Sequence, residues 1–79
     1  MSFDYSALGQ TIKEIRKEKG LSQEVLRGLA GIARTHLSMI ENNTMKANIE
    51  TVDKIAQALD LRISELFAYV EERQDNGEK

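Results

Sequence analysis

The chain has 79 residues, a formal net charge of −2 and neither cysteine nor proline. It is long enough for one small domain, and it can form neither disulfides nor thiolate metal sites. No run approaches the roughly 18 apolar residues of a membrane span, and the N-terminus lacks the charged and apolar regions of a signal peptide. These features exclude a disulfide-stapled or membrane-spanning protein and predict a cytoplasmic location.

The two halves of the chain differ in charge. Residues 1–46 carry seven Lys and Arg against five Asp and Glu, whereas residues 47–79 carry four against eight. Overall acidity argues weakly against nucleic acid binding, yet this asymmetry can conceal a DNA-facing surface behind a neutral average. Two ordinary solvated faces explain the same pattern equally well.

Apolar residues recur at helical spacing and predict an all-α fold of five helices without strands. The predicted helices span residues 6–19, 23–30, 34–42, 49–59 and 63–72. Ser6 or Asp4 caps the first helix, Gly20 ends it in the left-handed conformation, and Asn48 caps the fourth. Residues 1–72 are expected to form a single domain, and residues 73–79 a polar tail that frays.

Three of the helix starts share a hydrophobic staple, in which an apolar residue before the N-cap packs on the fourth helical residue. The pairs are Leu21 with Leu26, Ile32 with Leu37, and Leu61 with Leu66. Of the residues at the three caps, Ser22 can accept a hydrogen bond, whereas Ala33 and Arg62 cannot. The predicted core is Leu8, Ile12, Ile15, Leu26, Leu29, Leu37, Ile40, Val52, Ile55, Leu59 and Leu66.

The stretch 22–43 organises the rest of the chain. Its two helices are shorter than the roughly 12–15 residues that an isolated helix needs, so they must pack on each other and on the remaining helices. A short turn containing Gly31 joins them, which is typical of a helix-turn-helix. In that motif the second helix enters the major groove of DNA.

Polar residues cover the outer face of this second helix once Leu37 and Ile40 point inward. An arginine can bind guanine with two hydrogen bonds, and a threonine can contact thymine or a phosphate. The free N–H groups around Gln23 can hold a phosphate, and the loop after the second helix can touch the DNA backbone. The candidates are Gln23, Arg34, Thr35, His36, Ser38, Met39, Asn42, Asn43, Lys46 and Asn48. Singly, each is explained as well or better as an ordinary solvated residue; on this motif they favour DNA.

Catalytic chemistry has almost no candidates. His36 is the only histidine, and the chain has no glycine-rich phosphate loop. A metal site needs three or four ligands at defined spacing, and none accompany this imidazole. The sequence therefore predicts a protein that is not an enzyme and that has no catalytic residue, metal or cofactor.

The segments IKEIRKEKGLSQEVL, RTHLSMIENN and TVDKIAQALDLRISELF give the chain a resemblance to lambda-repressor and Cro-like helix-turn-helix proteins, the Xre family. The resemblance covers residues 12–67 and implies the compact five-helix fold of that family, with the motif formed by helices two and three. It implies that Gln23 contacts a phosphate and that an ion pair between Arg16 and Glu41 orients the recognition helix. The residues that match base readers are Arg34, Thr35, His36 and Ser38.

The resemblance also implies a homodimer that binds a palindromic DNA operator through two recognition helices. The short length and the Arg-Thr-His-Leu-Ser run are most similar to the controller proteins of restriction–modification systems. One departure is Arg27, which stands where the family usually has alanine. Its side chain is expected to extend outward past the partner helix, or the two motif helices pack less tightly. An apolar stripe on the last helix predicts the dimer interface, formed by Ile63, Phe67, Tyr69 and Val70.

Three functions are compatible with this scaffold. The favoured one is a transcriptional regulator that binds double-stranded DNA, with RNA polymerase as a further candidate partner and no small-molecule effector. The alternative is an antitoxin-like module whose main partner is a second protein, because a fold does not by itself settle function. An RNA-binding domain ranks last, since the stacking aromatic side chains of such modules are missing.

Overall fold

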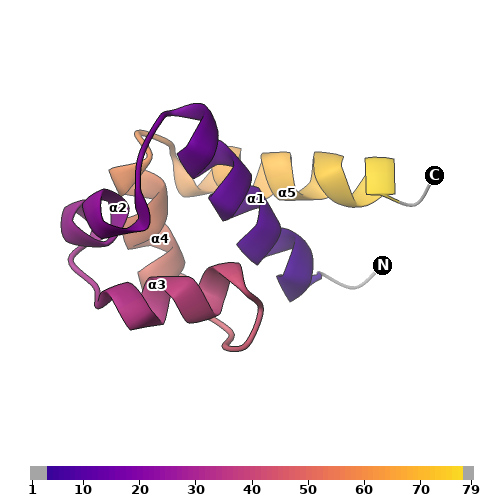
Figure 1. Ribbon diagram of the computed structural model, residues 1–79. Helices are drawn as coiled ribbons and strands as arrows, with labels where there is room; N and C mark the ends of the chain where they lie inside the picture. Colours follow the sequence, from indigo (N-terminus) through magenta and orange to yellow (C-terminus); the bar gives the residue numbers. More distant parts are fainter. Residues whose placement is uncertain (1–3, 78–79) are drawn as a thin grey trace.

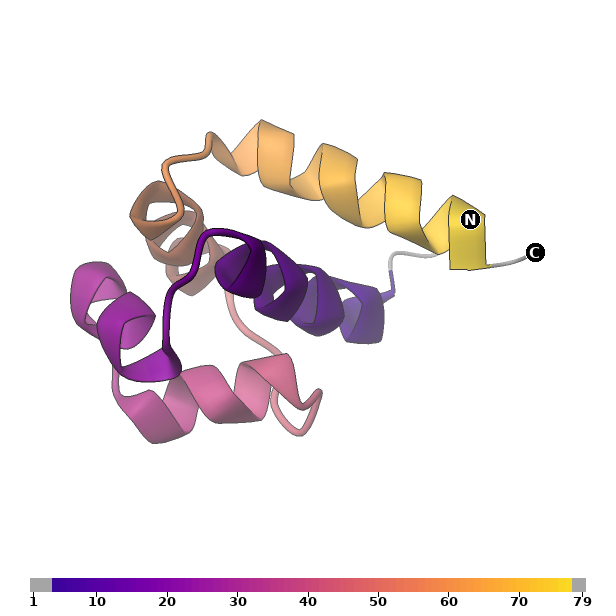
Figure 2. The same cartoon turned by 45° about the horizontal axis from the view of Figure 1, so that its top comes forward.

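The computed structural model describes residues 4–77, which form five α-helices and no strand. The helices are α1 (Tyr5–Glu18), α2 (Gln23–Ala30), α3 (Arg34–Glu41), α4 (Ile49–Ala58) and α5 (Ile63–Gly77). α1 lies between α3 and α5 and contacts both (Figures 1 and 2), while α2 packs on α3 and α4. The predicted all-α, five-helix class is confirmed. No helix within residues 4–77 is long and apolar enough to cross a membrane.

Side-chain caps begin three of the helices. The carboxylate of Asp4, the hydroxyl of Ser22 and the amide oxygen of Asn48 accept hydrogen bonds from first-turn N–H groups at 2.9, 3.1 and 2.8 Å. Each bond satisfies a donor that has no partner within its helix. Ala33 precedes α3 without such a bond. The start of α3 therefore depends on packing and on backbone hydrogen bonds.

Four helices end at a residue in the left-handed conformation. Gly20 and Gly31 have φ values of 72° and 71°, and Asn43 and Asp60 both have φ of 62°. After each of them the next N–H bonds back to a carbonyl in the last helical turn, which closes the helix in a Schellman motif. These tight ends keep the connections between the helices short.

α5 is longer than the sequence predicts. The predicted end at residue 72 is wrong, because the helix continues to Gly77. Nε of Arg73 lies 2.6 Å from a carboxylate oxygen of Glu14, and its Nη2 lies 3.5 Å from Glu18. These pairs join the extra turn of α5 to α1. Residues 78–79 of the predicted tail lie outside the described residues.

The core fills the space between the five helices. With the exception of Leu29, every predicted core residue is at most 4% exposed. The prediction for Leu29 is wrong, since its side chain is 61% exposed. The inward side of α2 is formed by Leu26 and Ala30, one turn apart. Successive helical residues are about 100° apart around the axis, so Leu29 projects to one side of the line from Leu26 to Ala30 and stays largely exposed.

α1 and α3 come into backbone contact at Gly9. A Cβ atom at this position would lie 2.2 Å from the carbonyl oxygen of Ile40, far inside van der Waals contact. Only glycine permits this approach. It positions the C-terminal half of α3 directly against α1.

Candidate nucleic-acid interface

α3 has one face in the core and one face in solvent. Leu37, Ile40 and Glu41 are buried, whereas Arg34 and Thr35 in the first turn are exposed. The half-buried or exposed remainder of the outer face is His36, Ser38, Met39 and Asn42. In both views α3 lies at the edge of the molecule with its outer side free (Figures 1 and 2). The four predicted base readers therefore lie on the outer side of one packed helix, where Arg34 and Thr35 are exposed and His36 and Ser38 are half-buried.

A buried ion pair fixes the end of α3. Nε of Arg16 lies 2.8 Å from one Glu41 oxygen, and Nη2 lies 3.0 Å from the other. The remaining terminal nitrogen donates to the carbonyl of Leu21 at 2.8 Å. The Arg16 side chain is 8% exposed and that of Glu41 is 0% exposed. This two-bond geometry, removed from water, sets both the position and the rotation of α3 relative to α1.

Gln23 joins the same group from the first turn of α2. Its Nε2 donates a hydrogen bond to Glu41 at 3.0 Å. A carboxylate can only accept, so the amide nitrogen must face inward. One N–H of that nitrogen is thereby occupied, and its second N–H and the oxygen remain for other partners. Gln23 can meet a phosphate with this second donor, and α1, α2 and α3 share one buried carboxylate.

The C-terminal end of α3 is tightly folded. Asn42 is the C-cap, and its Nδ2 lies 3.4 Å from the Ser38 hydroxyl. Asn43 takes the left-handed conformation, and the following residue, Thr44, bonds back to the carbonyl of Met39 through its backbone N–H at 2.9 Å. Asn42 and Asn43 both have exposed side chains. They therefore border the outer face of α3 where it meets the loop.

The loop from α3 to α4 carries the last two DNA candidates. Lys46 is exposed, and its Nζ lies 5.1 Å from the centre of the Tyr5 ring. The side-chain oxygen of Asn48 caps α4. The amide nitrogen of Asn48 is therefore left for another partner, whereas the Lys46 ammonium faces an aromatic ring.

Arg27 extends outward from α2. Its Nε donates to the Glu24 carboxylate at 3.0 Å, and Nη2 makes a second contact to the same oxygen. These bonds lower the pKa of Glu24 and raise that of Arg27. The nearby charge of Arg34 also lowers the pKa of Glu24. The Arg27 side chain therefore extends outward, which is the first of the two arrangements expected from the sequence.

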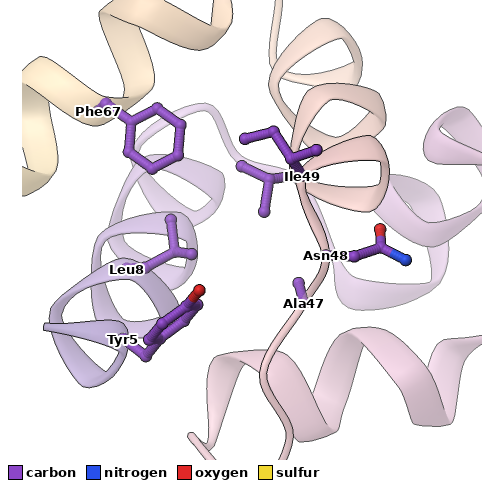
Figure 3. Close-up of a pocket in the computed structure, with 7 residues that line it drawn as sticks. Tyr5, Leu8, Ala47, Asn48, Ile49 and Phe67 are labelled. Atoms are coloured by element: carbon purple, nitrogen blue, oxygen red, sulfur yellow. The ribbon is translucent and has the colours of Figure 1, made fainter. Parts of the chain in front are cut away.

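The predicted dimer residues differ in accessibility. Val70 is 0% exposed and belongs to the hydrophobic core of the chain. Ile63 and Phe67 are half-buried, and Tyr69 is exposed. Phe67 also lines an apolar groove of about 290 Å³ between α1, α5 and the start of α4 (Figure 3). The groove is lined by Tyr5, Leu8, Ala47, Asn48, Ile49, Val52 and Phe67.

Three residues around this site were missed by sequence reasoning. Ile49 is 64% exposed beside the groove, although its position three residues before Val52 extends the apolar stripe of α4. Gly9 lies within the α1 stripe, and a glycine among helix-forming residues is a signal of close approach. Tyr5 had no signal in the sequence, because its partner Lys46 is distant along the chain.

The outer face of α3 and the loop that follows it present groups suited to binding. Their exposed groups are hydrogen-bond donors, hydroxyls and cations, which match base edges and phosphates. Within residues 4–77, no group of three or more His, Cys, Asp or Glu side chains could hold a metal ion.

The comparisons with known proteins agree with this geometry. A helix-turn-helix family matches residues 12–66 of the chain. The transcriptional regulator SinR of Bacillus licheniformis is 36% identical over 72 residues, which are 90% of this chain and 65% of SinR. The control protein C.MunI from a Mycoplasma species is 38% identical over 64 residues, which are 80% of this chain and 86% of C.MunI.

A solved structure extends the likeness to three dimensions. It contains a variant of the protein C.Esp1396I bound to its highest affinity operator site. That chain superposes with a TM-score of 0.83 at 32% identity, covering 91% of this chain and 95% of that one. The chain described here belongs to the helix-turn-helix family, in its lambda-repressor and Cro-like, or Xre, branch.

Proposed function

We propose that this protein is a cytoplasmic, sequence-specific transcriptional regulator that binds a palindromic DNA operator as a homodimer, as a restriction–modification controller does. The observation that carries the proposal is the exposed first turn of α3 on a helix held by the buried pair of Arg16 and Glu41. A transcriptional role also makes RNA polymerase a candidate partner.

The proposed DNA contacts fall into two groups, those to base edges and those to the phosphate backbone. Arg34, Thr35, His36 and Ser38 would reach base edges from α3, with Met39 and Asn42 beside them. Gln23 would meet a phosphate with the N–H that Glu41 leaves available. The loop residues Asn43, Lys46 and Asn48 would contact the backbone on the other side of the groove. Backbone contacts would fix the register, and α3 would supply the sequence preference.

A homodimer would place two copies of α3 on successive turns of the duplex, roughly 34 Å apart. The apolar surface for such an interface combines the predicted Ile63, Phe67 and Tyr69 with the neighbouring groove and Ile49. Val70 would support this surface from behind. Because a two-fold axis brings the same residues from both copies together, a groove beside an exposed isoleucine is suited to self-association.

Selection from random DNA tests the function as a whole. Duplexes retained by the protein should converge on a palindrome whose half-sites are about 10 base pairs apart. Affinity for the selected duplex should fall steeply with salt, as counterions are released. Failure to enrich any sequence, with weak binding to all DNA, would contradict the proposal.

Arg34→Ala tests base reading. It should weaken operator binding by about 1–3 kcal/mol and relax the preference at one position of each half-site. Arg62→Ala is the matched control, because it removes an exposed arginine from the position just before α5. The first turn of α5 lies far from α3 (Figures 1 and 2). Equal losses on operator and random DNA would instead give Arg34 a phosphate role.

The interface is tested by Phe67→Asp and Ile49→Asp. Both should give monomers in light scattering and weaken operator binding, since each monomer would hold only one half-site. Ile49 is largely exposed in the protomer, so its variant should fold normally even if Phe67→Asp does not. Dimers that survive both substitutions would place the interface elsewhere.

A second candidate function is an antitoxin-like module that binds another protein. It is favoured by Val25 and Leu29, which lie one turn apart on α2 and are both exposed. Purification from the native host should decide between the two functions. A stoichiometric second protein, together with weak DNA binding, would support the antitoxin reading.

A further inference from the structure

The loop between α3 and α4 is fixed at both of its ends. Thr44 bonds to the carbonyl of Met39 through its backbone N–H at 2.9 Å and through its hydroxyl at 3.2 Å. At the other end, Ala47 is buried and Asn48 caps α4. Lys46 is exposed between these ends. Its backbone position is therefore set, and only its long side chain remains to be ordered.

The Tyr5 ring restricts the position of the Lys46 side chain. The ammonium of Lys46 lies 5.1 Å from the ring centre, which is within the range of a cation–π interaction. Tyr5 is the first residue of α1 and also lines the apolar groove beside Ala47 (Figure 3). The ring is thus held by the fold, and it connects the start of α1 to the loop that follows α3.

The Tyr5 ring carries no charge, so its contact with Lys46 leaves the ammonium charge available to attract DNA. Arg16 and Arg27 are paired with carboxylates, which neutralise them locally. In the part of the chain that the structure describes, no carboxylate lies within ion-pair distance of Lys46. An aromatic face orients an ammonium without cancelling its charge and leaves N–H donors free on the other side.

We propose that Tyr5 is a positioning residue for DNA binding, whose ring holds the Lys46 ammonium in place for a backbone phosphate beside the recognition helix. The inference rests on the proposed function and adds a residue outside the motif to it. A lysine that is already oriented loses less side-chain freedom when it meets the phosphate. The N-terminus of α1 thereby contributes to affinity without touching DNA.

A double-mutant cycle tests the coupling, with Tyr5→Leu, Tyr5→Phe and Lys46→Met measured by fluorescence anisotropy on the selected operator. Tyr5→Phe keeps the aromatic face and should bind like the wild type. Tyr5→Leu should weaken binding about two- to fivefold, the strength of an exposed cation–π contact. Lys46→Met should reduce the salt slope by about one, and Tyr5→Leu should then have no further effect.

A second measurement does not depend on DNA. In the free protein, the ring current of Tyr5 should shift the NMR signals of the Lys46 side-chain methylenes, and Tyr5→Leu should abolish this shift. Unshifted methylenes in the wild type would overturn the inference. So would tighter operator binding by Tyr5→Leu, or equal losses in both Lys46 backgrounds. A wild type that shows the shift but enriches no operator would refute the proposed function and, with it, this role of Tyr5.

Discussion

Replacing Gly9 by alanine tests the backbone contact between α1 and α3. The new Cβ would lie 2.2 Å from the Ile40 carbonyl oxygen, whereas ordinary contact begins at 3.4 Å, so α1 and α3 must separate by about an ångström. Overpacking of this kind costs about 1–3 kcal/mol, and alanine returns about 0.5–1 kcal/mol through its helix propensity. The difference is a net loss of roughly 0–2.5 kcal/mol, and its midpoint near 1 kcal/mol corresponds to about 4–8 °C in Tm for a domain of this size.

Thermal unfolding followed by circular dichroism measures this loss. Gly28→Ala is the matched control, because a Cβ there would meet nothing within 4 Å. That variant should be more stable than the wild type by about 0.5–1 kcal/mol. Under the proposed function, the Gly9 variant should also bind the operator more weakly, since α3 is the helix that would be displaced. A Gly9 variant that gains as much stability as the Gly28 variant would refute the close approach.

Three further predictions concern buried or paired polar groups. Glu41→Gln leaves a buried guanidinium without its counter-charge, so urea denaturation should show a loss of roughly 3 kcal/mol. Thr11→Val should raise the free energy of unfolding by about 1 kcal/mol, because the buried Thr11 hydroxyl has no hydrogen-bond partner within residues 4–77. Hydrogen bonds from Gln10 and Arg73 lower the pKa of Glu14 below its ordinary value of 4.5. Its contribution to stability is therefore complete above that pH and is lost as the pH falls through the lowered value. The urea midpoints of Glu14→Gln and the wild type should converge under acid conditions; a constant difference would contradict this role.

The sequence predicted the helix-turn-helix and most helix boundaries because their causes are local. Ser22, Asn48 and Gly20 act within a few residues of their own positions, so caps and left-handed ends can be located by spacing. The end of α5 could not be located in this way. It depends on Arg73 meeting Glu14, 59 residues away along the chain, and local composition indicated only a polar tail.

The sequence predicted which residues lie on the outer face of α3, but it did not predict all of the side-chain contacts around that helix. Helical periodicity placed Arg34 and Thr35 outside once Leu37 was inside. The hydrogen bond that ties Gln23 to Glu41 depends on three helices meeting, which no local pattern records. The predicted burial of Leu29 was wrong for a related reason, since an apolar residue on a two-turn helix is buried only where a neighbouring helix covers it.

Under the proposed function, the division of α3 into a buried side and an outer side has an evolutionary consequence. Leu37, Ile40 and Glu41 maintain the attachment, while Arg34 and Thr35 contribute nothing to the interior. Changes in DNA preference can therefore accumulate one amino acid at a time without endangering folding. A library randomised at the outward positions alone should yield mostly folded proteins, from which regulators with new target sequences can be chosen.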